Sequence, residues 1–185
     1  NNLGYIFSQG CQKLFLGICF IIFFAVFGDK YPMFAVGKAE LRETYPYFWQ
    51  RLLYMYLCGP VGRAKYYVAW LLTYSSLIFS GMAYGESKDK KTGKLIRDVE
   101  KGSYGSILYN EFGMNPTEKM RYWNASIHNW LKCNVYVRVL GSKTIFRNNK
   151  VIASFCTFGI SAIWHGFYPS YYVSFVMIYL FEQDG

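Results

Sequence analysis

Metal-binding and disulfide patterns are missing from this sequence of 185 residues. It contains only two histidines, and no C-x-x-C spacing occurs among its five cysteines, which are Cys11, Cys19, Cys58, Cys133 and Cys156. A zinc or di-iron site needs a cluster of such ligands, and a cysteine in an apolar run behaves as a small hydrophobic residue. We therefore expect no metal and no disulfide framework.

Charged residues are also scarce. They make up 17% of the sequence, whereas 53% is hydrophobic and 21% is aromatic. A soluble domain needs a larger polar shell, so this composition favours a protein embedded in a membrane. Isolated strands would leave backbone groups unsatisfied in lipid, and we therefore predict an all-α, multi-spanning fold. Residues 87–94 (SKDKKTGK) are typical of a charged loop.

Two N-terminal apolar segments are compared with the roughly 20 residues that a helix needs to cross about 30 Å of hydrocarbon. Residues 66–84 contain no charge, and we predict a transmembrane helix there. The segment of residues 14–27 is shorter than a membrane-spanning helix needs to be, and it lies between Lys13 and Asp29. They span only if residues 10–12 join the helix or if Lys13 snorkels; otherwise they form a short buried helix.

A third apolar run covers residues 151–180 and is interrupted at Pro169, which lacks a backbone N–H and tends to break a helix. We predict two helices joined by a tight turn, and assign residues 151–181 to transmembrane helices. The fourth apolar segment, residues 52–58, is too short to cross. Gly59 and Pro60 should end it, so we predict a re-entrant or interfacial piece.

Residues 85–150 carry 13 Lys and Arg against 6 Asp and Glu, which supplies +7 of the formal net charge of +9. Such an excess marks the cytoplasmic side of a membrane protein. The tripeptide at residues 124–126 is formally an N-glycosylation sequon, which would need the lumenal side, but we favour the charge pattern. Since Trp and Tyr are mixed with these charges, we expect lipid head groups or cofactor phosphates as partners, and no nucleic acid.

Residues 115–139 (NPTEKMRYWNASIHNWLKCNVYVRV) lie within this basic segment and open with a typical helix start. Trp123, Trp130 and Leu131 would form an aromatic face of the helix, whereas Asn124 and His128 are four residues apart and would share another face. Periodicity alone leaves an alternative open, namely an amphipathic helix at the membrane interface with Trp as belt residues.

His165 lies within the second motif, residues 161–167 (SAIWHGF), in an otherwise uncharged apolar segment. Ionisable groups in such a place are costly and often functional. A histidine can accept a proton from a hydroxyl near neutral pH. The alternative is a histidine at the membrane edge that is hydrogen-bonded to a carbonyl or to Ser161.

The pattern W-N-x5-W-L at residues 123–131, V-Y-x-R at 135–138 and S-A-x-W-H-G-F-Y-P-x-Y-Y at 161–172 resembles the membrane-bound O-acyltransferase family. The resemblance is closest to the lysophospholipid acyltransferase branch, and Ser170 departs from it where relatives are expected to have Gly. Asn124 and His165 stand in the expected order, 41 residues apart. Because the chain begins at Asn1 rather than at Met, we expect part of one longer membrane-embedded acyltransferase domain.

The resemblance implies acyl transfer from acyl-CoA, used as a co-substrate without a tightly bound cofactor, to the hydroxyl of a lysophospholipid. His165 would be the general base and Asn124 the residue that stabilises the oxyanion or orients the substrate. Substrate-binding residues would be Trp123, Trp130, Lys132, Arg138 and Trp164. His128 is the rival base. The resemblance also implies an integral protein of the endoplasmic reticulum or another intracellular membrane.

Two other functions stay open at this point. One is a sterol, diacylglycerol or protein O-acyltransferase of the same architecture. The other is a catalytically inactive structural subunit of a membrane complex. A homo-oligomer is equally compatible with the sequence.

Overall fold

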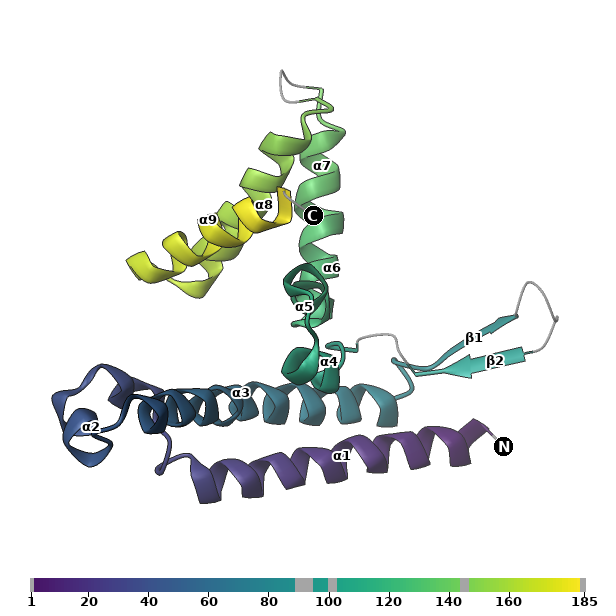
Figure 1. Ribbon diagram of the computed structural model, residues 1–185. Coiled ribbons are helices and arrows are strands. Elements are labelled where there is room, and N and C mark those ends of the chain that lie inside the picture. The colour runs from purple at the N-terminus through teal and green to yellow at the C-terminus, as the bar shows by residue number, and fades with distance from the viewer. Residues whose placement is uncertain (1, 89–94, 100–102, 144–146, 184–185) are drawn as a thin grey trace. The chain divides into compact units, whose positions relative to one another are not determined.

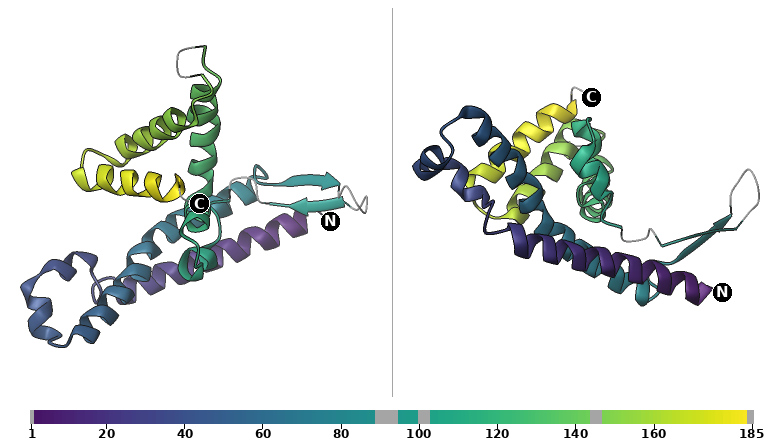
Figure 2. Two further views of the ribbon diagram at one scale, coloured as in Figure 1. Left: turned by 45° about the horizontal axis from the view of Figure 1, so that its top comes forward. Right: turned by 60° about the horizontal axis from the view of Figure 1, so that its bottom comes forward.

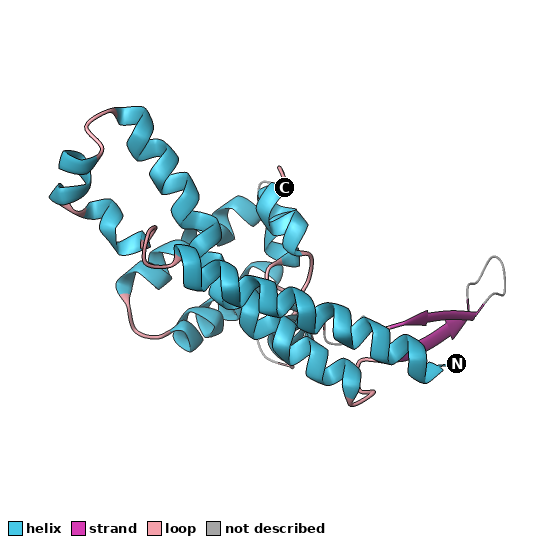
Figure 3. Cartoon of the chain, turned by 90° about the horizontal axis from the view of Figure 1, so that it is seen from below, coloured by secondary structure: helices cyan, strands magenta, loops and turns pink. Residues whose placement is uncertain are grey.

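The computed structural model describes residues 2–88, 95–99, 103–143 and 147–183. Most of these residues are helical, and the described part of the chain also contains one antiparallel hairpin, in which β1 (Gly85–Lys88) pairs with β2 (Leu95–Asp98), as Figure 3 shows. The all-α prediction is therefore confirmed with one small addition. The first two residues of the loop predicted over residues 87–94 belong to strand β1. The other residues of that loop, 89–94, lie outside the described part of the chain. The chain divides into two compact units, Asn1–Ser103 and Tyr104–Gly185.

In the N-terminal unit, α1 (Asn2–Phe27) and α3 (Phe48–Phe79) lie side by side (Figures 1 and 2). The buried face of α3 recurs every three or four residues, as expected for a helix with one packed side, and consists of Tyr54, Cys58, Val61, Ala64, Tyr67, Leu71, Tyr74, Ser75 and Ile78. A Cβ at Gly10 would lie 2.6 Å from the Phe79 ring, so the glycine permits this close approach. The Ser75 hydroxyl donates to the Gly10 carbonyl at 3.1 Å.

Among the described helices, α1 is the one that is long and apolar enough to cross a membrane, over Leu3–Phe27. Residues 10–12 do join the helix, which meets the condition set by the sequence. The helix predicted over residues 66–84 has the wrong bounds. The observed helix, α3, already begins at Phe48 and ends at Phe79. The ammonium of Lys13 lies 5.8 Å from the centre of the Tyr74 ring.

The prediction that Gly59 and Pro60 end a short piece at residues 52–58 is also wrong, since α3 continues through both residues. Proline removes one backbone hydrogen bond and costs stability inside a helix. Tertiary packing compensates: η1 (Met33–Gly37) and α2 (Ala39–Thr44) join a hydrophobic cluster with the first half of α3, formed by Leu41, Tyr54 and Cys58 with Tyr31, Ala35, Val36 and Tyr45.

The C-terminal unit contains α4 (Ile107–Phe112), α5 (Pro116–Tyr122), α6 (Ala125–Leu131), the π-helix η2 (Lys132–Tyr136), α7 (Val137–Leu140), α8 (Lys150–His165) and α9 (Pro169–Gln183). Three of these, α6, η2 and α7, follow one another without a break, and α8 packs against η2 and α7. The two helices predicted around Pro169 are confirmed. The proline begins α9, where its missing N–H is not needed.

Candidate functional site

The segment that carries Asn124 is not the continuous helix predicted for residues 115–139. Asn124 separates α5 from α6 with a left-handed backbone (φ 49°, ψ 52°), a conformation that asparagine adopts more readily than most residues. The N–H of Ala125 donates to the Tyr104 carbonyl at 3.1 Å, which diverts it from the helical pattern. The prediction of one helix that runs through Asn124 is therefore wrong.

Asn124 instead begins α6 as its N-cap residue, and its carbonyl accepts from the His128 N–H at 3.0 Å. Its side chain is half-buried, and its Oδ1 atom is buried with no hydrogen-bond partner among the described residues. Asn124 Nδ2 is the donor end of this carboxamide. Such a donor could stabilise an oxyanion.

His165 is the last residue of α8 and is exposed. Its Nδ1 atom lies 2.7 Å from the Ser161 carbonyl. A carbonyl only accepts hydrogen bonds, so Nδ1 carries the hydrogen and the neutral ring presents Nε2 as a proton acceptor. The carbonyl hydrogen bond that belongs to the structural alternative for His165 is thus present. The same bond selects the tautomer that a base acting through Nε2 requires.

Two aromatic side chains of α9 hold the imidazole in place. The centre of the His165 ring lies 5.6 Å from that of Tyr171 and 5.1 Å from that of Phe175. The chain reaches these residues through Gly166, whose φ of 104° would strain any other residue. The carbonyl bond and the two rings together favour one orientation of the imidazole.

A tryptophan pair joins the two motifs. The rings of Trp130 in α6 and Trp164 in α8 meet edge to face, with centres 5.4 Å apart and an interplanar angle of 86°. Trp164 directly precedes His165. Within the described part of the chain no hydrogen bond joins Asn124 to His165, and the tryptophan pair is the ring contact between their two motifs.

The remaining predicted substrate-binding residues differ in their surroundings. Trp123 is half-buried next to Asn124, whereas Lys132 and Arg138 are exposed. Lys132 opens the π-helix η2, in which the Asn134 amide donates to the Trp130 carbonyl at 2.9 Å. π-Helical turns are frequent at functional sites, and the hydropathy pattern contains no signal for one.

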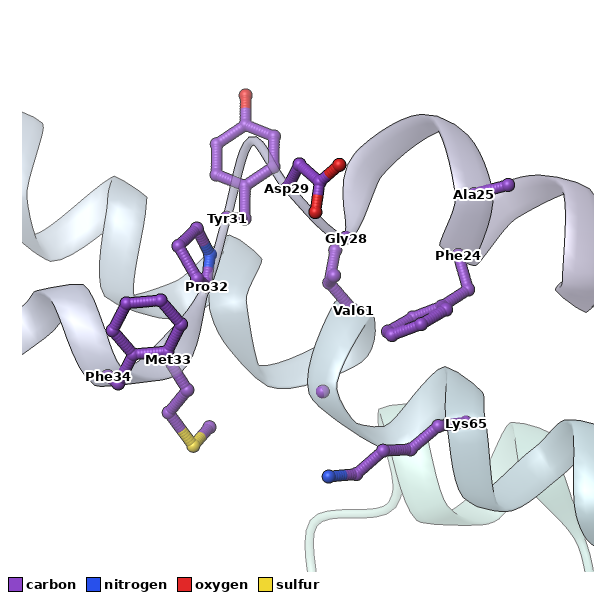
Figure 4. A pocket seen from close by; sticks show the side chains of 11 residues that line it. Phe24, Ala25, Gly28, Asp29, Tyr31, Pro32, Met33, Phe34, Val61 and Lys65 are labelled. Carbon is purple, nitrogen blue, oxygen red and sulfur yellow. The ribbon is translucent and has the colours of Figure 1, made fainter.

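One pocket of about 500 Å³ lies in the N-terminal unit, between the end of α1, η1 and the middle of α3 (Figure 4). Apolar side chains such as Phe24, Tyr31 and Met33 line it together with Asp29 and Lys65. No residue predicted for the site lines this pocket. A search of the described residues finds no group of three or more His, Cys, Asp or Glu side chains that could hold a metal ion.

Similar proteins agree with the motifs. The chain is 35% identical over 141 residues to "Lysophospholipid acyltransferase" of Saccharomyces cerevisiae, an alignment that covers 73% of this chain and 21% of the relative. It is 32% identical over 131 residues to "Lysophospholipid acyltransferase 2" of Arabidopsis thaliana, covering 70% of this chain and 27% of the relative. The chain is 28% identical over 166 residues to "Membrane-bound glycerophospholipid O-acyltransferase 1" of Mus musculus, an alignment that covers 89% of this chain and 30% of the relative.

The chain thus spans less than a third of the length of these relatives. A family model, described as "MBOAT, membrane-bound O-acyltransferase family", matches residues 3–182, which include both the Asn124 turn and the end of α8. This match covers nearly the whole sequence, and the chain therefore belongs to the membrane-bound O-acyltransferase family.

Proposed function

We propose that this chain is part of a multi-spanning acyltransferase that transfers an acyl group from acyl-CoA to the hydroxyl of a lysophospholipid in an intracellular membrane such as the endoplasmic reticulum. In this proposal the Asn motif within residues 85–150 and the His motif within residues 151–181 belong to one domain. The names of the similar proteins support the substrate class.

His165 acts as the general base in this proposal. The lysophospholipid oxygen attacks the thioester carbonyl carbon, and Nε2 takes the proton of the hydroxyl as the C–O bond forms. When the tetrahedral intermediate collapses, the C–S bond breaks, and the imidazolium returns this proton to the leaving thiolate of CoA. No covalent acyl-enzyme is needed, because both substrates are held together.

The observation that carries this assignment is the hydrogen bond between His165 Nδ1 and the Ser161 carbonyl. It leaves Nε2 of the neutral ring with a free lone pair, and the rings of Tyr171 and Phe175 lie against the imidazole. Asn124 Nδ2 is the proposed donor to the oxyanion. In other acyl-transfer sites, removal of one such donor costs about 3 kcal/mol of transition-state stabilisation.

The test uses the full-length protein in membranes with labelled acyl-CoA and a panel of acceptors: several lysophospholipids, a sterol and diacylglycerol. We expect labelled phospholipid only, and we expect His165→Ala to remove it while protein level and acyl-CoA binding persist, because loss of a general base acts on the chemical step. Acylation of the sterol or diacylglycerol alone would assign another acceptor class. Equal turnover by His165→Ala would exclude His165 as the base.

A further inference from the structure

Residues 104–110 lie directly against the turn that carries Asn124. The Ala125 N–H donates to the Tyr104 carbonyl at 3.1 Å. Next to it, Gly105 has a φ of 103°, and a Cβ at this position would lie 2.0 Å from the Tyr122 carbonyl oxygen. A residue with a side chain at position 105 would clash with the Tyr122 carbonyl unless the turn moved. The glycine therefore permits the close contact between this segment and the turn.

Asn110 contacts the same carbonyl from α4. It is only 6% exposed, and its Nδ2 atom donates to the Tyr122 oxygen at 3.4 Å. Its Oδ1 atom is buried and has no hydrogen-bond partner among the described residues. A buried carboxamide with one unpaired end is costly, and an apolar residue of similar shape would avoid this cost. The one hydrogen bond of this carboxamide goes to the carbonyl that directly precedes Trp123 and Asn124.

The start of α4 is itself well fixed, which gives Asn110 a rigid base. The Ser106 hydroxyl oxygen caps the helix by accepting from the Tyr109 N–H at 3.2 Å. The Tyr109 ring packs on the Tyr122 ring with centres 4.6 Å apart. Tyr109 also donates to the Glu118 carboxylate. Helices α4 and α5 are therefore held together immediately before the turn.

We propose that Tyr104, Gly105 and Asn110 form a clamp that holds Asn124 in its left-handed conformation, with Asn110 as the positioning residue. This proposal rests on the proposed function for the part that concerns catalysis. Asparagine adopts the left-handed region more readily than most residues, as Asn148 also does, so the clamp adds to a preference that Asn124 already has. The clamp aims the carboxamide of Asn124 without touching the reacting atoms.

The experiment compares variants of the full-length protein in lipid nanodiscs. Asn110→Asp keeps the side-chain shape and removes the donor to the Tyr122 carbonyl. Asn129→Asp makes the same chemical change at an exposed position of α6 and serves as the matched control. We expect Asn110→Asp to lower kcat about tenfold with KM for both substrates nearly unchanged, because a small misplacement of a catalytic group acts on the chemical step. Asn129→Asp should stay within about twofold of the wild type.

Hydrogen exchange gives a readout that does not depend on catalysis. Amides of residues 122–126 should exchange about tenfold faster in Asn110→Asp, and those of α8 should not change. If Asn110→Asp does not fold, Asn110→Ser, which keeps a smaller neutral side chain, replaces it in both measurements.

A double-mutant cycle with Asn124→Ala completes the test. In that background Asn110→Asp should lower kcat by less than about twofold. The clamp is overturned if exchange of residues 122–126 stays at the wild-type rate, or if Asn110→Asp lowers kcat as much in the Asn124→Ala background as in the wild type. If exchange accelerates while Asn124→Ala keeps normal kcat, the clamp stands and the catalytic role of Asn124 fails.

Discussion

The two units of the chain differ in the regularity of their backbone. In the N-terminal unit, α1 and α3 are long helices of 26 and 32 residues, and α3 is uninterrupted even at Pro60. The C-terminal unit has a left-handed residue at Asn124, a π-helix at η2 and a positive φ at Gly166. Irregular backbone at membrane depth is tolerated only where it is buried in protein or lines a cavity. Under the proposed function, the first unit anchors the protein and the second unit carries the chemistry.

The largest effect should come from the end of α8. His165→Asn keeps a donor for the Ser161 carbonyl and removes Nε2, so kcat should fall by about 10² to 10⁴ while acyl-CoA binding remains. His128→Asn is the control, since His128 is exposed and lies in the other motif. Single-turnover acyl transfer measures both variants. A larger loss for His128→Asn would reverse the assignment of the base.

A change in the N-terminal unit should alter stability and leave the chemistry intact. Gly10→Val places a side chain where a Cβ already lies 2.6 Å from the Phe79 ring, and should cost about 1–3 kcal/mol of folding free energy. Gly4→Val makes the same change in α1 at a position with nothing within 4 Å of the Cβ. We expect the thermal midpoint of the purified full-length protein to fall for Gly10→Val only. A lower kcat per folded molecule would contradict the division between anchor and chemistry.

The tryptophan pair should have an intermediate effect. An edge-to-face pair contributes about 0.5–1.5 kcal/mol, so Trp130→Ala and Trp164→Ala should each lower kcat/KM by about two- to twelvefold. The double variant should lose little more than either single variant, because both remove one contact. Trp49→Ala, an exposed tryptophan of the N-terminal unit, should have no effect on kcat/KM. Fully additive losses would show that the rings act separately.

The smallest effect concerns the exposed cations of the C-terminal unit. If Lys132 and Arg138 attract substrate phosphates, Lys132→Gln and Arg138→Gln should each raise KM for acyl-CoA by about two- to fivefold at low salt. The difference should shrink at high ionic strength, where exposed charges are screened. Lys143→Gln, also exposed, should leave KM unchanged. A salt-independent rise would indicate a structural role for these side chains.

The apolar periodicity of the sequence and the positions of its glycines and prolines predict the regular helices of this fold. Examples are the two helices around Pro169 and the helix start at Pro116. These patterns failed at Pro60, where contacts of η1 and α2 with the first half of α3 outweigh the local preference of proline. They also failed at Asn124. The contacts of this left-handed turn with Tyr104 and Gly105 join residues that are far apart in the sequence. The role proposed for Asn110 could not be predicted from the sequence either, since no sequence pattern reveals a buried, unpaired amide oxygen.

The position of Lys13 along α1 has a consequence for the lipid around this protein. Helix α1 has 26 residues and is therefore about 39 Å long, but the stretch from Lys13 to Phe27 measures only about 21 Å. This is shorter than the roughly 30 Å of an ordinary hydrocarbon layer. If α1 crosses the membrane, the ammonium beside the Tyr74 ring must draw head groups and water inward on its side. The bilayer would then be thinner beside this helix than elsewhere, which, under the proposed function, would shorten the path of a lysophospholipid from the surface into the protein.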